Sequence, residues 1–318
     1  MKSYCISHRK DVDGLGAAAL VSAATGAELC LSDYDDLLSN LRKVPKDAEK
    51  VFLCDLGADN SDLEEFIKVM GEVASRGGVT YIDHHFLSPG AKARLRRGGV
   101  RVVHDLKDCS SMLAYKELRE ELPDGAGLVA LAGAVTDYMD DSTAAKELME
   151  QMDRQFVLLE STMLAFALSK RGAEEGFPER IAEELSKMKR PHEIEGVAEA
   201  AAQQLEDVVR LEEAVREGGR KLGKIAYMVT KQYSTGNVAK LLIGAFGVPV
   251  GIAMKEKQPG WYEVSLRGTS KCRANLGRTI SKVSSKLGGS GGGHARAAGC
   301  RVPKEAAQEM LSLVERAV

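Results

Sequence analysis

Val79-Thr80-Tyr81-Ile82-Asp83-His84-His85 is the most informative stretch of the chain, because a strand-like apolar run ends directly in one carboxylate and two imidazoles. Similar short apolar runs alternate with amphipathic stretches through the first 105 residues. This alternation predicts an α/β fold with a doubly wound, mostly parallel sheet. The expected strands cover residues 4–7, 28–31, 51–54, 79–82 and 100–103, and the expected helices include 14–24 and 63–74.

The pattern changes twice after this predicted sheet. Helical periodicity extends from residue 110 to about 171, and residues 178–220 are charged and rich in Ala and Glu. A β signal returns after Gly218-Gly219, with expected strands at 224–230, 248–254 and 261–266 and expected helices at 237–244, 276–286 and 303–318. We therefore predict three regions: a domain over 1–190, a helical connector over 191–220 and a smaller α/β domain over 221–318.

Composition limits the class of protein. The 318 residues are enough for two cores, and 44% hydrophobic and 28% charged residues are ordinary globular values. The formal net charge of -2 provides no global basic field for long nucleic acid. Nowhere do about 18 uncharged apolar residues occur in a row, so no membrane span is expected. The scattered cysteines lack CxxC spacing and predict a reduced, cytoplasmic protein; they are Cys5, Cys30, Cys54, Cys109, Cys272 and Cys300.

Acidic residues follow several of the predicted strands and helices. Asp11 and Asp13 lie between the first strand and helix, in His8-Arg9-Lys10-Asp11-Val12-Asp13-Gly14. Asp55 closes the run 51–54, and Asp137 ends an apolar helix. Each acid alone could equally be a helix cap or a turn residue. In open parallel sheets, however, ligands bind outside the carboxyl ends of the strands, which is where these side chains are expected to gather.

Taken together, these carboxylates and imidazoles predict a site for divalent cations. So many negative charges would repel one another strongly, and bound cations reverse that effect. Oxygen-rich ligands with a few histidines suit Mn²⁺, Mg²⁺ or Co²⁺ better than a structural zinc site, which favours thiolates. Two such ions would activate a water and stabilise the entering and leaving oxygens of a phosphoryl displacement.

The C-terminal region contains the glycine tract Ser290-Gly291-Gly292-Gly293-His294-Ala295-Arg296. Glycines without a Cβ let backbone N–H groups approach a phosphate or a nucleobase, and His294 and Arg296 add donors. A flexible linker is the alternative, but the small-residue, strand-like run that follows argues against it. Arg267 is expected at the end of a strand, with Lys271 and Arg273 nearby, and could bind a phosphate or remain a solvated charge.

These residues resemble the DHH phosphoesterase superfamily, and specifically its DHH/DHHA1 branch of RecJ-like nucleases, nanoRNase-like short-oligonucleotide ribonucleases and cyclic-dinucleotide phosphodiesterases. The resemblance covers nearly the whole chain, from His8-x-x-Asp11-x-Asp13-Gly14 through Asp83-His84-His85 to Gly291-Gly292-Gly293-His294-x-x-Ala297-Ala298-Gly299. It implies two metal ions, most readily Mn²⁺, with Asp55 bridging them. By this resemblance His8, Asp11 and Asp55 hold one ion, and Asp13, Asp55, His84 and Asp137 hold the other.

The resemblance also implies roles outside the metal ligands. His85 would contact the scissile phosphate or protonate the leaving oxygen, and Asp83 would orient the two histidines. In the C-terminal domain, Arg267, His294 and Gly291-Gly292-Gly293 would bind the distal part of a nucleotide, and Arg296 lies within the same motif. A cleft between the domains would admit a short single-stranded end.

Three functional hypotheses remain open from the sequence. The first is a Mn²⁺-dependent phosphodiesterase that cuts short oligonucleotides or linear dinucleotides to mononucleotides, since the chain lacks the basic track of a processive nuclease. The second is a cyclic-dinucleotide phosphodiesterase or a 3'-phosphoadenosine 5'-phosphate phosphatase. The third is a non-catalytic nucleic-acid or replication scaffold, which would be expected to lack metal ligands. No motif indicates the substrate, the cleavage polarity or the oligomeric state, although a homodimer is compatible with the sequence.

Overall fold

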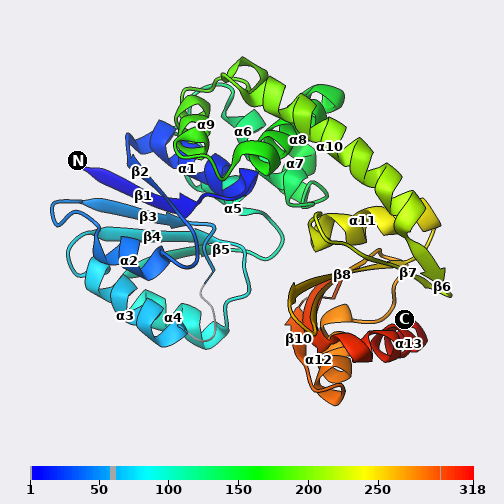
Figure 1. Ribbon diagram of the computed structural model, residues 1–318. Helices are drawn as coiled ribbons and strands as arrows, with labels where there is room; N and C mark the ends of the chain where they lie inside the picture. The colour runs from blue at the N-terminus through cyan, green and yellow to red at the C-terminus, as the bar shows by residue number, and fades with distance from the viewer. Residues whose placement is uncertain (1, 58–61, 294) are drawn as a thin grey trace. The chain divides into compact units, whose positions relative to one another are not determined.

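The computed structural model describes residues 2–57, 62–293 and 295–318 (Figure 1). The chain divides into two compact units, Met1–Leu205 and Glu206–Val318. The division falls inside the long helix α10 (Val197–Gly218). The domain limits expected from the sequence, at residues 190 and 220, stay predictions.

The first unit is built on a five-stranded sheet with the order β2-β1-β3-β4-β5, and every pair of neighbouring strands is parallel. Adjacent residues of one strand face opposite cores: Val51 and Leu53 pack on one side, and Phe52 and Cys54 on the other. Helices cover both faces, which confirms the predicted doubly wound α/β fold. The strands are β1 (Ser3–His8), β2 (Glu28–Ser32), β3 (Lys50–Cys54), β4 (Gly78–Asp83) and β5 (Val100–His104).

Two groups of helices enclose this sheet (Figure 1). One face carries α2 (Leu37–Arg42), α3 (Leu63–Ala74) and α4 (Pro89–Arg97). The other face carries α1 (Val12–Thr25), α5 (Ser110–Glu117), α6 (Ala126–Thr136), α8 (Arg154–Arg171) and α9 (Phe177–Ser186), with α7 (Thr143–Met149) following α6. The 3₁₀ turn η1 (Pro191–Glu193) precedes α10.

The second unit contains a six-stranded mixed sheet with the order β10-β11-β9-β8-β7-β6. Only the β7–β8 pair is parallel among the described strands of this sheet. The strands are β6 (Arg220–Leu222), β7 (Ile225–Val229), β8 (Val250–Gln258), β9 (Trp261–Gly268), β10 (Ser290–Gly293) and β11 (Ala297–Pro303). The helices are α11 (Thr235–Phe246), α12 (Leu276–Lys286) and α13 (Ala307–Ala317), with the 3₁₀ turn η2 (Lys304–Ala306) before α13.

The glycine tract forms the edge strand β10, and Gly292 pairs with Gly299 of β11. A Cβ on Gly289 would lie 2.0 Å from the carbonyl oxygen of Arg301, and one on Gly291 would lie 2.4 Å from the Cβ of Cys300. Real Cβ atoms essentially never come this close to a neighbour, so this part of the sheet requires glycine. The tract is therefore a paired strand and not a flexible linker, while His294 lies outside the described residues.

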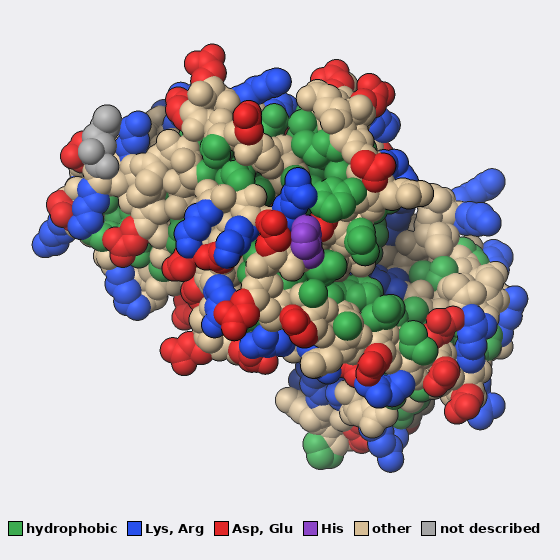
Figure 2. Space-filling view, turned by 90° about the horizontal axis from the view of Figure 1, so that it is seen from above, with side chains coloured by type: hydrophobic (Ala, Val, Ile, Leu, Met, Phe, Trp, Pro, Cys, Tyr) green, Lys and Arg blue, Asp and Glu red, His purple; other side chains and the backbone are tan. Residues whose placement is uncertain are grey.

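The surface is mixed in charge. On the face that Figure 2 shows, lysine and arginine side chains are interspersed with aspartate and glutamate, in keeping with the net charge of -2. Among the described residues, no helix combines the length and the apolar composition needed to cross a bilayer.

Candidate metal centre

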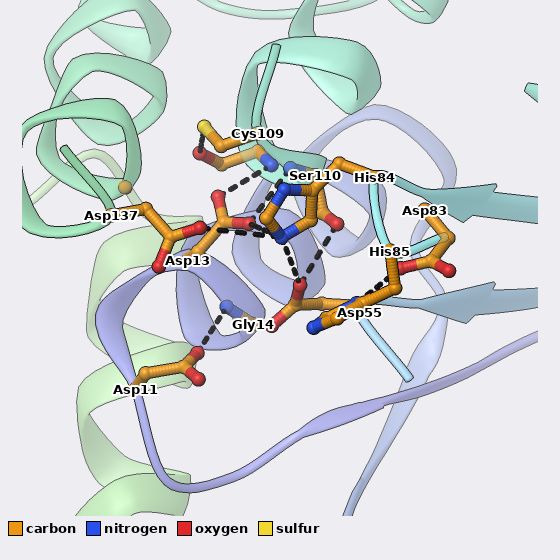
Figure 3. Close-up of polar contacts among 12 residues, drawn as sticks. Asp11, Asp13, Gly14, Asp55, Asp83, His84, His85, Cys109, Ser110 and Asp137 are labelled. Atoms are coloured by element: carbon orange, nitrogen blue, oxygen red, sulfur yellow. Dashed lines mark hydrogen bonds and ion pairs between the residues drawn. The ribbon is translucent and has the colours of Figure 1, made fainter. Parts of the chain in front are cut away.

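Three neighbouring strands deliver side chains to one edge of the first sheet. The register aligns Ser7 of β1 with Cys54 of β3, and Cys54 with Ile82 of β4. The residues that follow are His8 at the end of β1, Asp55 after β3, and Asp83, His84 and His85 at the end of β4. Helices add Asp11 and Asp13 at the start of α1 and Asp137 at the end of α6 (Figure 3). The edge therefore brings together all the predicted ligands of the N-terminal region.

His8, Asp11 and Asp55 form the first cluster of potential ligands. His8 Nδ1 lies 2.7 Å from Asp11 Oδ2 and 3.5 Å from Asp55 Oδ2. Despite these short distances, the buried Nδ1 atom has no properly oriented hydrogen-bond partner among the described residues. The other oxygen of Asp11 accepts a hydrogen bond from Gly14 N at 2.9 Å and caps α1. Asp11 is thus a helix cap and a potential ligand at the same time.

Asp13, His84 and Asp137 form the second cluster. His84 Nε2 lies 3.2 Å from Asp137 Oδ2, 3.3 Å from Asp55 Oδ1 and 3.8 Å from Asp13 Oδ2. In Figure 3 these four side chains point toward one another. One oxygen of Asp55 therefore faces the first cluster and the other faces the second.

The backbone and the charge of Asp55 are both unusual. Its φ of 57° lies in the left-handed region, which costs a non-glycine residue roughly 1–2 kcal/mol. Burial and the nearby carboxylate of Asp13 raise the pKa of Asp55 to about 7. Ser110 Oγ donates a hydrogen bond to Asp55 Oδ1 at 3.0 Å. Strain and charge repulsion at one residue are features that cluster at functional sites.

The electrostatics of the centre reflect crowded negative charge. Burial alone lowers the pKa of His8, but the adjacent carboxylates of Asp11 and Asp55 outweigh it and raise the pKa to about 10. Burial is likewise outweighed at His84, where Asp55, Asp13 and Asp137 raise the pKa to about 9. Burial, followed by Asp13, raises the pKa of Asp137 to about 6. Without a cation, protons on the imidazoles balance part of this charge.

His85 forms a third group of potential ligands with Asp55 and His84, and it is held by Asp83. Its Nδ1 lies 2.8 Å from Asp83 Oδ1, and Tyr81 donates its hydroxyl proton to the other oxygen of Asp83 at 2.7 Å. Burial raises the pKa of Asp83, but the contacts with His85 and Tyr81 outweigh it, so the pKa is lowered overall. Asp83 in turn raises the pKa of His85 against the effect of burial. On its other side, His85 Nε2 lies 3.4 Å from the hydroxyl of Tyr34.

Sequence reasoning missed the groups that hold Asp13. Ser110 N donates to Asp13 Oδ2 at 2.7 Å, and Ser111 N donates to Asp13 Oδ1 at 2.8 Å. These N–H groups belong to the first turn of α5, where the helix dipole favours a carboxylate. Gly133 of α6 completes the packing, since a Cβ there would lie 2.1 Å from Ser111 Oγ and 2.5 Å from Asp13 Oδ1. The two serines at the start of α5 could have indicated free N–H groups that bind an acceptor. Nothing in the sequence indicates that this acceptor is Asp13.

The predicted substrate-binding residues lie in the second unit. Arg267 of β9 pairs in register with Ala297 of β11, and its Nη1 donates to Leu266 O at 3.0 Å. Partial burial lowers the pKa of Arg267. The carbonyl of Arg296 accepts a hydrogen bond from Gly268 N at 2.9 Å, and the side chain is exposed. Arg267 and the β10 glycines thus belong to strands of one sheet, and Arg296 immediately precedes β11.

Comparisons with known proteins point to one family. Residues 223–318 match the family model of the DHHA1 domain. No curated protein sequence matches the chain. Among solved structures, the chain is similar to the pGpG-specific phosphodiesterase PggH of Vibrio cholerae, with 14% identity, a TM-score of 0.63 and 98% of each chain covered.

Two further structures extend this similarity. The DHH domain protein PF0399, described as a member of the s1p family of ribosomal proteins, gives a TM-score of 0.70 at 14% identity, over 99% of this chain and 86% of its own. RecJ of Thermus thermophilus, solved with Mn²⁺, gives a TM-score of 0.61 at 17% identity, over 99% of this chain and 51% of RecJ. The chain therefore contains a DHHA1 domain at residues 223–318, and its fold is similar to that of PggH, the DHH domain protein PF0399 and RecJ.

Proposed function

We propose that this chain is a two-metal phosphodiesterase that hydrolyses short oligonucleotides or linear dinucleotides to mononucleotides. The observation that carries the proposal is the pair of ligand clusters at the carboxyl edge of the first sheet, with Asp55 between them. The likeness in fold to PggH, which covers nearly the full length of both chains, supports a small dinucleotide substrate.

The donor atoms suit hard divalent cations. Four carboxylates and two imidazoles surround the two clusters, and no thiolate is among them. His8 Nδ1 makes no well-oriented hydrogen bond, and once deprotonated it could coordinate a metal ion. Such a set favours Mn²⁺, Mg²⁺ or Co²⁺ over structural zinc. We assign one ion to His8, Asp11 and Asp55, and the other to Asp13, Asp55, His84 and Asp137.

The chain's own groups provide the rest of the chemistry. Bound cations would supply an activated water and would neutralise charge on the phosphoryl oxygens. Asp83 holds His85 by its Nδ1 atom and favours its protonated form, so that His85 can deliver a proton to the leaving oxygen. Tyr34 lies against both His8 and His85, with ring centroids 5.4 Å and 6.4 Å away, and limits their movement.

The DHHA1 domain would bind the distal part of the substrate. Among the described residues, no carboxylate contributes to the pKa shift of Arg267, and its Nη2 lies 3.3 Å from the point where a Cβ on Gly236 would stand. Gly236 is in the first turn of α11, so a guanidinium and the positive end of a helix lie side by side. An anion such as a phosphate would relieve this repulsion. The edge glycines of β10 and the side chain of Arg296 extend the same surface.

The test is the release of mononucleotides from pGpG, pApA, short RNA, short DNA, cyclic di-AMP and pyrophosphate, with Mn²⁺, Mg²⁺ or EDTA. We expect metal-dependent cleavage confined to the short linear nucleotides. His84→Ala is the inactive comparison, and Leu159→Ala, an exposed change on α8, is the matched control. Cleavage of cyclic di-AMP alone would favour the cyclic-dinucleotide alternative. No hydrolysis of any compound would favour the scaffold.

A further inference from the structure

Exposed apolar side chains gather next to the candidate metal centre. In the described part of the first unit, the exposed large hydrophobic residues are Tyr34, Phe86, Leu106, Tyr138, Leu159 and Leu205. The first four follow a strand or a predicted ligand at the carboxyl edge of the sheet: Phe86 comes after His85, and Tyr138 comes after Asp137. Aromatic side chains left exposed around a site are typical of surfaces that stack nucleobases.

Two of these residues line a cavity of about 740 Å³ in the first unit. Leu106, 58% exposed, lies in the β5–α5 loop, and Tyr138, 77% exposed, lies in the α6–α7 loop. Tyr138 has a left-handed φ of 59°, a conformation that a tyrosine adopts only where the surrounding fold imposes it. Cavities of this size accept molecules as large as a nucleoside.

The cavity wall is connected directly to the metal centre. Tyr138 follows the predicted ligand Asp137 in the chain, and Asp108 of the wall comes two residues before Ser110. Ser110 donates one hydrogen bond to Asp55 and one to Asp13. The cavity is therefore lined by segments that directly adjoin residues of the metal centre.

The polar groups of the wall are mainly acceptors. Asp105, Asp108, Asp141 and Glu147 line the cavity together with Lys107 and Lys116. Lys116 Nζ already binds Asp108 Oδ2 at 3.0 Å. Asp108 is 5% exposed, and its buried Oδ1 has no hydrogen-bond partner among the described residues. An unbonded buried acceptor is unfavourable, and an N–H group of a ligand, directly or through one water, would satisfy it.

We propose that this cavity binds a nucleobase of the substrate, stacked on Tyr138 with its N–H edge toward the acidic wall, and that it favours guanine. This inference rests on the proposed phosphodiesterase function. The excess of carboxylates disfavours a second phosphate in the cavity. Guanine presents two adjacent donors, N1–H and the N2 amino group, which match one carboxylate. Adenine offers one amino group beside an acceptor nitrogen, and uracil offers one N–H between two carbonyls.

The test compares kcat and KM for pGpG, pApA, pUpU and pIpI, whose hypoxanthine bases lack the N2 amino group. For the wild type we expect the lowest KM with pGpG and an intermediate KM with pIpI. Tyr138→Ala should raise the KM for pGpG about tenfold through lost stacking, with a smaller effect on kcat, and Tyr138→Phe should restore it. Asp141→Asn should reduce the preference for pGpG over pApA. Leu159→Ala, an exposed change away from the cavity, is the control.

A parallel titration with GMP and AMP measures the cavity without turnover. Tighter binding of GMP, weakened by Tyr138→Ala and not by Leu159→Ala, would support the inference even if no dinucleotide were cleaved. In that case the proposed function alone would fail. Hydrolysis with equal KM values for all four dinucleotides, or an unchanged KM in Tyr138→Ala, would overturn the cavity assignment and leave the phosphodiesterase standing.

Discussion

Gly133 offers a direct test of how tightly the centre is packed. In Gly133→Ala, the new methyl group would lie 2.1 Å from Ser111 Oγ and 2.5 Å from Asp13 Oδ1. The matched control is Gly71→Ala, because Gly71 also lies within a helix of the first unit and a Cβ there meets nothing within 4 Å. Both substitutions add the same atom to a helix, so the difference between them reports the contact with Asp13.

The magnitude follows from two opposing effects. Replacing a helical glycine with alanine gains roughly 0.5–1 kcal/mol, and this gain is common to both variants. Overpacking a buried site costs about 1–3 kcal/mol, and only Gly133→Ala incurs it. We therefore expect Gly71→Ala to be slightly more stable than the wild type, and Gly133→Ala to be less stable than Gly71→Ala by about 1–3 kcal/mol.

The same displacement should weaken metal binding, because Asp13 is held by the N–H groups of Ser110 and Ser111 and has little room to move. Urea unfolding of the protein gives the stability difference, and calorimetric titration with Mn²⁺ gives the affinity. If Gly133→Ala matched Gly71→Ala in stability and kept wild-type affinity for Mn²⁺, the close packing of Gly133 against Asp13 would be wrong.

Three further predictions concern the ligands and their charge. His84→Ala should abolish hydrolysis while far-UV circular dichroism stays unchanged, and retained turnover would contradict the ligand assignment. Because the pKa values of about 10 for His8 and about 9 for His84 leave both imidazoles protonated near neutral pH, Mn²⁺ binding should release protons. Calorimetric enthalpies should then vary with the buffer, the affinity should rise with pH through this range, and EDTA should lower the melting temperature of metal-loaded protein. Asp83→Asn removes the charge that raises the pKa of His85, so an NMR titration should show that pKa falling, and no change would exclude the contact.

The sequence was enough to predict that the residues at the strand ends meet, because parallel strands bring these ends to one edge of the sheet. Parallel strands place their carboxyl ends at one edge, so His8, Asp55 and Asp83 had to be neighbours once the strands were recognised. The short helix α4 was missed because its sequence is strongly basic and buries only Ala91 and Leu95. Strand β10 was missed because glycines provide no alternating side-chain pattern.

The remaining parts of the site depend on tertiary packing that no local pattern contains. Ser110 and Ser111 reach Asp13 only because α5 begins next to α1, and Gly133 matters only because α6 crosses the same point. Tyr34 follows an unremarkable Asp33 in the sequence, yet its ring lies against two predicted site histidines. Such contacts form only when distant segments pack together, so the spacing of residues along the sequence does not predict them.

Asp13 connects the metal centre to the β5–α5 loop through its hydrogen bonds to the start of α5. Its oxygens bind the first N–H groups of α5, and the residues just before that helix form the wall with Asp108. If a cation shifts Asp13, the start of α5 and the wall before it would shift as well, and occupancy of one site would then alter the affinity of the other. Thermodynamic linkage would make the effect reciprocal: if Mn²⁺ changes the affinity for a nucleoside by some factor, the nucleoside changes the affinity for Mn²⁺ by the same factor.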